Sequence, residues 1–227
     1  MRQSRAVVTN MIALSGDHAI GLEVGSKTEL TDLGLVGYAM MSSRLLRHTV
    51  EYWVNYGNAL VGMLLQVRLE EQAPDNWSLT FFESMPLEAI RHFCAEEQLV
   101  MAYKLGCDLA SIRPKLRHLE LAYSAPLHWE RYHDHFDCPV TFNARHTRLS
   151  FSSPRLDQTL RGNDEELNQL CARQCALVAQ QMRRHDTLSS EIVRILAGPS
   201  RTVPSLDDVA REFNMSARTL RRHLQAE

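Results

Sequence analysis

The sequence lacks the features that mark membrane and secreted proteins. A membrane-spanning helix needs roughly eighteen or more consecutive apolar residues, and no apolar run approaches that length. The five cysteines are an odd number and contain no CxxC pair, so a secreted disulfide framework is not expected. The N-terminus has neither the apolar core nor the small-residue cleavage site of a signal peptide. We therefore expect a cytoplasmic protein with reduced thiols and no membrane partner.

Catalytic and cofactor motifs are also missing. The chain contains no GxSxG nucleophile motif, no glycine-rich loop that would cradle a phosphate and no paired metal-ligand motif. Three glutamates, Glu83, Glu96 and Glu97, lie near predicted apolar faces, but nothing in the sequence brings them to one reaction centre. We therefore predict that the protein is not an enzyme and that it has no catalytic residues, no cofactor and no metal site.

The most chemistry-like stretch, residues 128–138, is rich in histidine. It contains side chains of the types that coordinate zinc: His133, His135 and Cys138, with Asp134 or Asp137. On a helix, however, residues two apart point about 200° away from each other. A helix end that leads into a strand, with Trp129 and Phe136 as core anchors, accounts for the same residues. A pH-responsive or pocket role is the other alternative.

The small net charge limits how the chain can bind nucleic acid. The 227 residues are 44% apolar and 23% charged, with a formal net charge of −2. Such a chain can bury a proper core as one large or two smaller domains. Any DNA binding must come from a local basic patch, because the chain as a whole is not basic. The C-terminal end provides such a patch.

Residues 204–225 predict two short helices around a tight turn. Ser205 precedes an acidic first turn with Asp208 three positions on, which is typical of a capping box. Asn214 tolerates the left-handed conformation that a tight turn needs, and Ser216 is a good cap for the second helix. The apolar residues of the first helix recur at helical spacing: Leu206, Val209, Ala210 and Phe213.

The second of these helices has two distinct faces. Its apolar residues Ala217, Leu220 and Leu224 share one side, whereas its arginines lie on another. Arginine binds phosphate and reads guanine edges in the major groove. A solvated basic surface helix is the alternative. We predict a helix-turn-helix whose DNA-binding residues are Ser216, Arg218, Arg221, Arg222 and Gln225.

The upstream residues predict helices packed on an antiparallel sheet, an α+β fold that ends near residue 160. The glycine-rich segment 16–25 is expected to turn the chain, and Gly34 and Gly37 indicate a close backbone contact. The predicted helices are 4–14, 43–60, 86–106 and 126–132, and the predicted strands are 63–70, 77–83, 116–123, 139–142 and 147–152. The first two strands would form a hairpin, and the last two would pair with each other.

A connecting helix is expected over 164–184, because its start is acidic and its end is basic. Its apolar stripe is heptad-like but too short to establish a coiled coil. We expect it to pack on the upstream domain; self-association, which would make a homodimer, is the alternative. Cys171 and Cys175 share one of its faces, but nothing nearby completes a metal or redox site. One more helix is predicted over 188–197.

The C-terminal stretch resembles a known DNA-binding element, the first helix-turn-helix of AraC/XylS-type transcription regulators. The likeness is carried by Ser205-Leu-Asp-Asp-Val-Ala210 and Met215-Ser216-x-Arg218-Thr-Leu220-x-Arg222-x-Leu224. It implies that residues 216–225 form a recognition helix, with Arg218, Arg221 and Arg222 facing DNA.

The N-terminal part resembles the ligand-sensing domain of one AraC-type subgroup, which is often labelled arabinose-binding-like and includes regulators of ornithine use. The matching segments are Ser15-Gly-Asp-x-x-x-Gly-Leu22, Leu33-Gly-Leu-Val-Gly-Tyr38 with Met41-Ser-Ser43, and Phe136-Asp-Cys-Pro-Val-Thr-Phe142. This chain has His18 where the subgroup usually has proline.

The resemblance implies a ligand-responsive transcription regulator with promoter DNA and a small-molecule effector as partners. Residues 1–160 would be the α+β sensor domain, 161–186 the connecting helix, and 187–227 the first half of an all-α helix-turn-helix domain. Such regulators carry more sequence at both ends, so we expect a truncated chain. The alternative is a stand-alone sensing or protein-interaction module that does not bind DNA. The sequence does not indicate which residues bind the effector.

Overall fold

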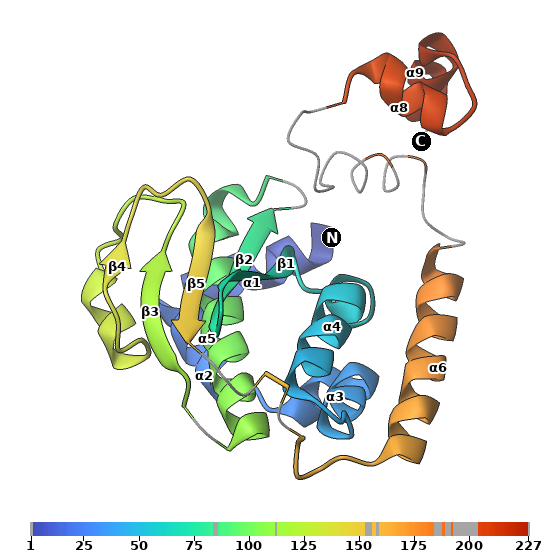
Figure 1. Ribbon diagram of the computed structural model, residues 1–227. Coiled ribbons are helices and arrows are strands. Elements are labelled where there is room, and N and C mark those ends of the chain that lie inside the picture. Colours follow the sequence, from blue (N-terminus) through green and yellow to red (C-terminus); the bar gives the residue numbers. More distant parts are fainter. Residues whose placement is uncertain are drawn as a thin grey trace.

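The structure is a computed structural model, shown in Figure 1, that describes residues 2–83, 86–111, 113–152, 156, 157, 159–183, 188, 192 and 204–226. The helices are α1 (Arg2–Ser15), α2 (Ile20–Lys27), α3 (Gly34–Met41), α4 (Leu46–Tyr56), α5 (Arg91–Ala110), α6 (Glu165–Arg183), α8 (Leu206–Glu212) and α9 (Ala217–Ala226). Short stretches of tighter or wider helix are η1 (Leu30–Leu33), η2 (Gly57–Val61), η3 (Glu88–Ile90) and η4 (Trp129–Asp134). The strands are β1 (Leu65–Ala73), β2 (Asn76–Glu83), β3 (Lys115–Glu120), β4 (Val140–Thr141) and β5 (Thr147–Ser152).

The five strands form one sheet in the order β1-β2-β5-β3-β4. The predicted hairpin is confirmed, because β1 pairs antiparallel with β2 around a turn in which Asp75 has a φ of 60°. Strand β5 then lies between β2 and β3 and is antiparallel to both. The α+β class predicted from the sequence is therefore confirmed, with helices packed on a single sheet.

Two details of the predicted sheet are wrong. Strand β5 does not pair with β4, and β4 runs parallel to β3, so the sheet is mixed rather than antiparallel. The physical reason is length. Strand β4 has only two residues, and its Thr141 carbonyl oxygen accepts the Leu121 amide over 2.8 Å. It is therefore too short to pair with the backbone hydrogen-bonding groups of the six-residue β5. The long strands β2 and β3 do so instead.

Segment 16–25, predicted to be a turn, is mostly helix. Only residues around Gly16, whose φ is 65°, turn the chain, and α2 starts at Ile20. Its Gly21 and Gly25 lie on one helical face against α5: a Cβ on Gly21 would lie 2.7 Å from the Phe93 carbonyl oxygen, and one on Gly25 would overlap the Glu97 carbonyl oxygen. These glycines therefore allow a close helix crossing.

The main hydrophobic core lies between the sheet and α5 (Figure 1). On α5 the buried residues include Phe93, Leu99 and Leu105, and the sheet contributes residues such as Leu119 and Leu149. The close backbone contact predicted at Gly34 and Gly37 is confirmed for Gly37 alone, where a Cβ would overlap the Leu30 carbonyl oxygen; a Cβ on Gly34 would meet no atom within 4 Å. This core supports the cavities described below.

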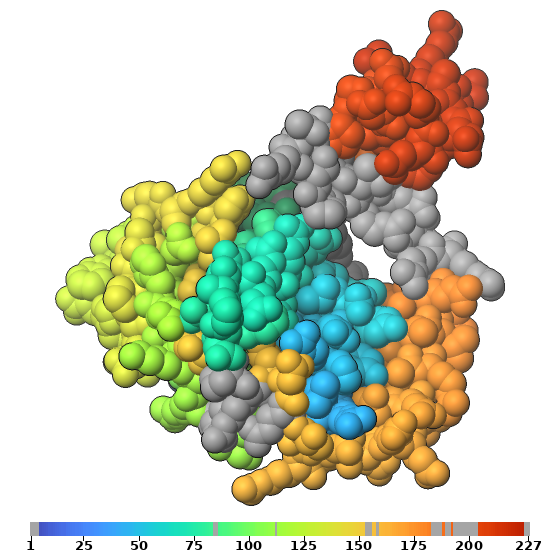
Figure 2. Space-filling model, viewed as in Figure 1, coloured from blue at the N-terminus to red at the C-terminus, as the bar shows by residue number. Residues whose placement is uncertain are grey.

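Helix α6 packs against α3. Cys171 and Cys175 are buried in this contact, and the Asn168 side-chain nitrogen donates to the Ala39 carbonyl oxygen over 2.8 Å. The Tyr52 hydroxyl in turn donates to the Asn168 side-chain oxygen over 3.1 Å. In Figure 2 the outer side of α6, in orange, forms an edge of the molecule.

Helices α8 and α9 have a small core of their own, formed around Val209, Ala210 and Leu220. The predicted caps are confirmed: the Asp208 amide donates to Ser205 Oγ over 3.2 Å, and the Ser205 amide donates to the Asp208 carboxylate over 3.0 Å. Asn214 adopts the predicted left-handed turn, with a φ of 53°. The helix predicted over 188–197 lies mostly outside the described residues.

Candidate functional site

The basic face of α9 is open to solvent. Arg218, Arg221 and Arg222 are exposed and line a shallow surface hollow together with Thr219. Leu220, on the opposite face, is fully buried. Among the described residues no carboxylate forms an ion pair with these three arginines, whereas Arg211 on α8 binds Asp208 over 3.1 Å. Their charges are therefore free to meet an anionic partner.

The other two residues predicted to bind DNA have different positions. Ser216 is exposed at the start of α9, where its Oγ accepts the Thr219 amide over 3.2 Å and shares a hydrogen bond with the Thr219 hydroxyl over 2.9 Å. Its hydroxyl is thus already used as a cap. Gln225 is part of α9, but its side chain lies outside the described residues.

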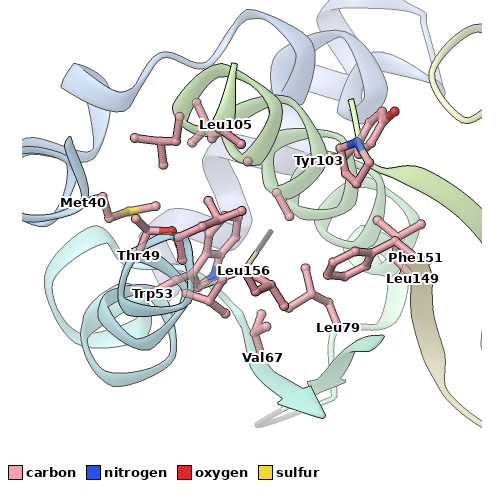
Figure 3. Close-up of a pocket in the computed structure, with 17 residues that line it drawn as sticks. Met40, Thr49, Trp53, Val67, Leu79, Tyr103, Leu105, Leu149, Phe151 and Leu156 are labelled. Carbon is pink, nitrogen blue, oxygen red and sulfur yellow. Dashed lines mark hydrogen bonds between the residues drawn. The ribbon is translucent and has the colours of Figure 1, made fainter. Parts of the chain in front are cut away.

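A small apolar cavity lies between the sheet and helices α4 and α5 (Figure 3). Its labelled residues include Trp53, Val67, Leu79 and Phe151, and its volume is about 70 Å³. The Trp53 indole nitrogen is buried without a hydrogen-bond partner in the described part of the chain. A cavity that binds benzene has about 150 Å³. This one is therefore too small for a metabolite unless its walls move.

A larger cavity of about 380 Å³ lies under α1. This volume falls within the roughly 300–1,000 Å³ of typical ligand sites. It is lined by Val7, Val8, Met11, Val24, Thr28, Asp32, Leu33, Val61, Gly62, Met63, Leu64, Phe93, Cys94, Glu97, Gln98 and Met101. These residues come from five segments: α1, α2 with the residue after it, η1, α5, and the end of η2 with the residues that follow it. We refer to this space as the α1 cavity.

Glu97 is the polar group of the α1 cavity with the most unusual environment. Burial alone raises the pKa of its carboxyl group to about 7, because no charged residue compensates for the lost water. The other buried polar side chain, Gln98, exchanges hydrogen bonds with the backbone of Leu65 over 3.1 and 3.3 Å. Burial also raises the pKa of the Cys94 thiol, to about 12, so it is not a reactive thiolate.

The neighbouring Glu96 belongs to a buried hydrogen-bond network on the other side of α5. Its Oε1 accepts the Tyr132 hydroxyl and contacts His128 Nε2, each at 2.6 Å, and Tyr132 shares a 3.0 Å hydrogen bond with the Tyr123 hydroxyl. Desolvation raises the pKa of Glu96, and the two hydrogen bonds only partly oppose it. This network fastens η4 to α5.

Within the histidine-rich stretch, His128 and Tyr132 thus have structural contacts. No group of three potential metal ligands occurs in the part of the chain that the structure describes. Arg131 on η4 forms two bonds to the Asp17 carboxylate, at 2.9 and 3.0 Å, and these bonds lower the pKa of Asp17. Phe136, predicted to be a core anchor, is fully buried, but Trp129 is 44% exposed, so its predicted anchoring role is wrong.

Sequence reasoning singled out Glu96 and Glu97 but not their partners or surroundings. The partners of Glu96 are Tyr132 of η4 and His128, the residue just before it; both lie more than thirty positions along the chain, and no local spacing indicates these contacts. The signal that was present is a pair of adjacent carboxylates inside a helix whose other residues are largely apolar.

Known proteins are similar to this chain over most of its length. The family model described as the arabinose-binding domain of AraC transcription regulators, N-terminal, matches residues 1–160. The ornithine utilization regulator of Pseudomonas aeruginosa is 29% identical over 215 residues, which are 94% of this chain and 62% of that protein. Uncharacterized HTH-type transcriptional regulators of Mycobacterium bovis and Mycobacterium tuberculosis are each 30% identical over 232 residues, covering 98% of this chain and 65% of the relative.

A solved structure shares the fold. The crystal structure of the transcriptional regulator CdpR from Pseudomonas aeruginosa aligns with a TM-score of 0.62 and 19% identity, over 96% of this chain and 71% of that one. The chain spans less than two thirds of the length of the curated relatives. No described helix is long and apolar enough to cross a membrane.

The family consists of transcription regulators rather than enzymes, as the sequence predicts. The resemblance noted in the sequence is confirmed, since the family model covers well over half of the chain. The chain belongs to the AraC-type transcription regulators that carry an N-terminal domain of the arabinose-binding type.

Proposed function

We propose that this chain is the sensing part, and the beginning of the DNA-reading part, of a ligand-responsive transcription regulator. Residues 1–160 bind a small metabolite, and residues 187–227 begin the DNA-binding domain. Residues 161–186 connect these two parts. The observation that carries the proposal is the set of exposed arginines on α9, opposite the buried Leu220, which form no ion pair within the described part of the chain. A helix of this kind suits the major groove of DNA.

The rest of the C-terminal geometry supports this proposal. The capped start of α8, the turn at Asn214 and the capped start of α9 hold two short helices together around a shared core. In a helix-turn-helix the second helix enters the groove with its N-terminal residues first. Arg218, Arg221 and Arg222 lie in the first part of α9, and each can contact phosphate or a guanine edge.

Fluorescence anisotropy with promoter duplexes at low salt tests DNA binding. Replacing Arg222 by alanine should weaken specific binding by about 5- to 150-fold, the effect of losing one base or phosphate contact of about 1–3 kcal/mol. Arg211→Ala is the matched control, because this arginine lies on α8 and is paired with Asp208. Equal binding by all three proteins would instead favour a sensing or interaction module that does not bind DNA.

We also propose that α6 associates with a second copy of the chain. Its outer face carries Leu167, Leu170, Leu177, Val178 and Met182, all of them at least 36% exposed. A helix that exposes so many apolar residues usually has a partner. Light scattering after size-exclusion chromatography should show a dimer that Leu170→Glu with Leu177→Glu converts to monomer. The control variant Gln180→Glu, which lies outside this face, should leave the dimer intact. If the unsubstituted protein is a monomer, the proposed dimer is refuted.

A further inference from the structure

The α1 cavity has an unbalanced charge. Among the described residues that line it there are two carboxylates, on Asp32 and Glu97, and no lysine, arginine or histidine. Asp32 is exposed, and its carboxylate accepts the Glu29 amide over 2.8 Å. Glu97 is half-buried and has no hydrogen-bond or ion-pair partner among the described residues. The charged side chains of the cavity are therefore acidic only, and no described residue compensates the carboxylate of Glu97.

The cations of the surrounding helices whose side chains are described are all engaged elsewhere. Lys104 of α5 binds the Thr28 carbonyl oxygen, Glu29 and Asp108 at 2.9–3.1 Å. The remaining cations with described side chains form ion pairs as follows: Arg5 with Glu88, Lys27 with Glu23, and Arg91 with Glu83. None of these groups can neutralise Glu97 without breaking its present contacts.

The backbone at Glu97 is closely packed. Where α2 crosses α5 there is no room for a Cβ on Gly25 against the Glu97 carbonyl group, so the two helix backbones are in contact at this residue. The walls beside it are apolar and include Val8 of α1, Val24 of α2 and Met101 of α5. An apolar chain that ends in a positive charge would match both the walls and the carboxylate.

We propose that the α1 cavity is the effector site of the sensor domain and that its ligand is a primary aliphatic amine, with the ammonium group bound by Glu97. The proposal rests on the sensing function proposed above, and it selects this cavity over the smaller apolar one. A carboxylate ligand is disfavoured, because Glu97 and Asp32 would repel it. A neutral alcohol would leave the buried carboxylate without a counter-charge.

Binding should be linked to protons. In the empty cavity burial holds the pKa of Glu97 at about 7, and a bound ammonium favours the ionised form and so lowers this pKa. The other titratable groups of the lining are Asp32 at the rim and the Cys94 thiol, whose pKa of about 12 keeps it neutral. Amine binding should therefore release a proton below pH 7 and release none well above it.

Isothermal titration calorimetry with hexylamine, hexanol and hexanoate tests the proposal on the whole chain, without DNA. Hexylamine should bind at least tenfold more tightly than the other two. At pH 6.5 its binding enthalpy should change with the ionisation enthalpy of the buffer, because the buffer takes up the released proton. Glu97→Gln should weaken hexylamine binding at least tenfold and abolish the proton release. Glu71→Gln, which removes an exposed carboxylate from the hairpin, should change neither.

Several outcomes would overturn the amine proposal. The proposal fails if Glu97→Gln leaves the affinity for hexylamine unchanged, or if hexanol or hexanoate binds as tightly as hexylamine. It also fails if hexylamine shows no saturable binding. A filling substitution, Val8→Phe, checks the location: it should weaken hexylamine binding, and unchanged affinity would place the ligand elsewhere. Because DNA binding is measured separately through Arg222, failure of one proposal is distinguishable from failure of the other.

Discussion

Glu96 and Glu97 are neighbours on α5, yet their carboxylates have opposite environments. That of Glu96 is fully buried and is bonded to Tyr132 and His128, whereas that of Glu97 lines a cavity and has no bonded partner among the described residues. One of the pair therefore holds the fold together, and the other remains free for a ligand.

The stability of the protein should fall as Glu97 ionises. Its folded-state pKa of about 7 lies above its ordinary value of 4.5, so between these values the folded state holds more protons than the unfolded state. The contribution of Glu97 to the free energy of unfolding is therefore largest below pH 4.5. It decreases by at most about 3 kcal/mol as the pH rises through 7. In Glu97→Gln this decrease should vanish in urea unfolding series, and it should persist in Glu71→Gln.

Removing the Tyr132 hydroxyl should be costly. This hydroxyl bridges Glu96 and Tyr123 inside the core, and Tyr132→Phe leaves both with one hydrogen bond fewer. Loss of such a buried partner costs about 1–3 kcal/mol, which chemical denaturation would show. Tyr38→Phe is the control, because Tyr38 is 47% exposed. An equal, small effect for both variants would argue against a structural role for the network.

The crossing of α2 and α5 predicts opposite effects for two glycine-to-alanine substitutions. At Gly25 a Cβ overlaps the backbone of Glu97, so the substitution should destabilise by about 1–3 kcal/mol or more. At Gly106, inside α5, a Cβ meets no heavy atom within 4 Å, so alanine should stabilise by about 0.4–1 kcal/mol. Thermal melts of the two variants should move in opposite directions.

The Asp17–Arg131 pair should contribute little. Their side chains are 36% and 41% exposed, so solvent screens the pair and Asp17→Asn should cost less than about 1 kcal/mol at pH 7. The pKa of Asp17 is lowered from 3.8, so this contribution is present above that value and is lost as the pH falls through the folded-state pKa. Equal losses at pH 7 and pH 2 would show that the charge is irrelevant.

The sequence predicts local structure here better than pairing. Alternation in 63–70 and 77–83 indicates the hairpin, and the caps at Ser205 and Ser216 are visible because their partners are three residues away. Strand order depends instead on contacts between segments as distant as β2 and β5. The alternation within residues 147–152 predicts a strand, but it does not predict which strands β5 pairs with.

The same limit applies to the candidate site. The arginines of α9 follow from helical spacing alone, whereas the α1 cavity needs five separate segments to be brought together. Gly21 and Gly25 were interpreted as turn residues because glycine serves both turns and close helix crossings, and only the position of α5 distinguishes the two uses.

The place of β5 in the sheet has a consequence for synthesis of the chain. The strand that completes the middle of the sheet is the last one to leave the ribosome, about seventy positions after its partner β2. Until Thr147–Ser152 emerge, β2 and β3 each have an unpaired edge that can add a foreign strand. Fragments that stop short of β5 should therefore aggregate, while chains that include it fold.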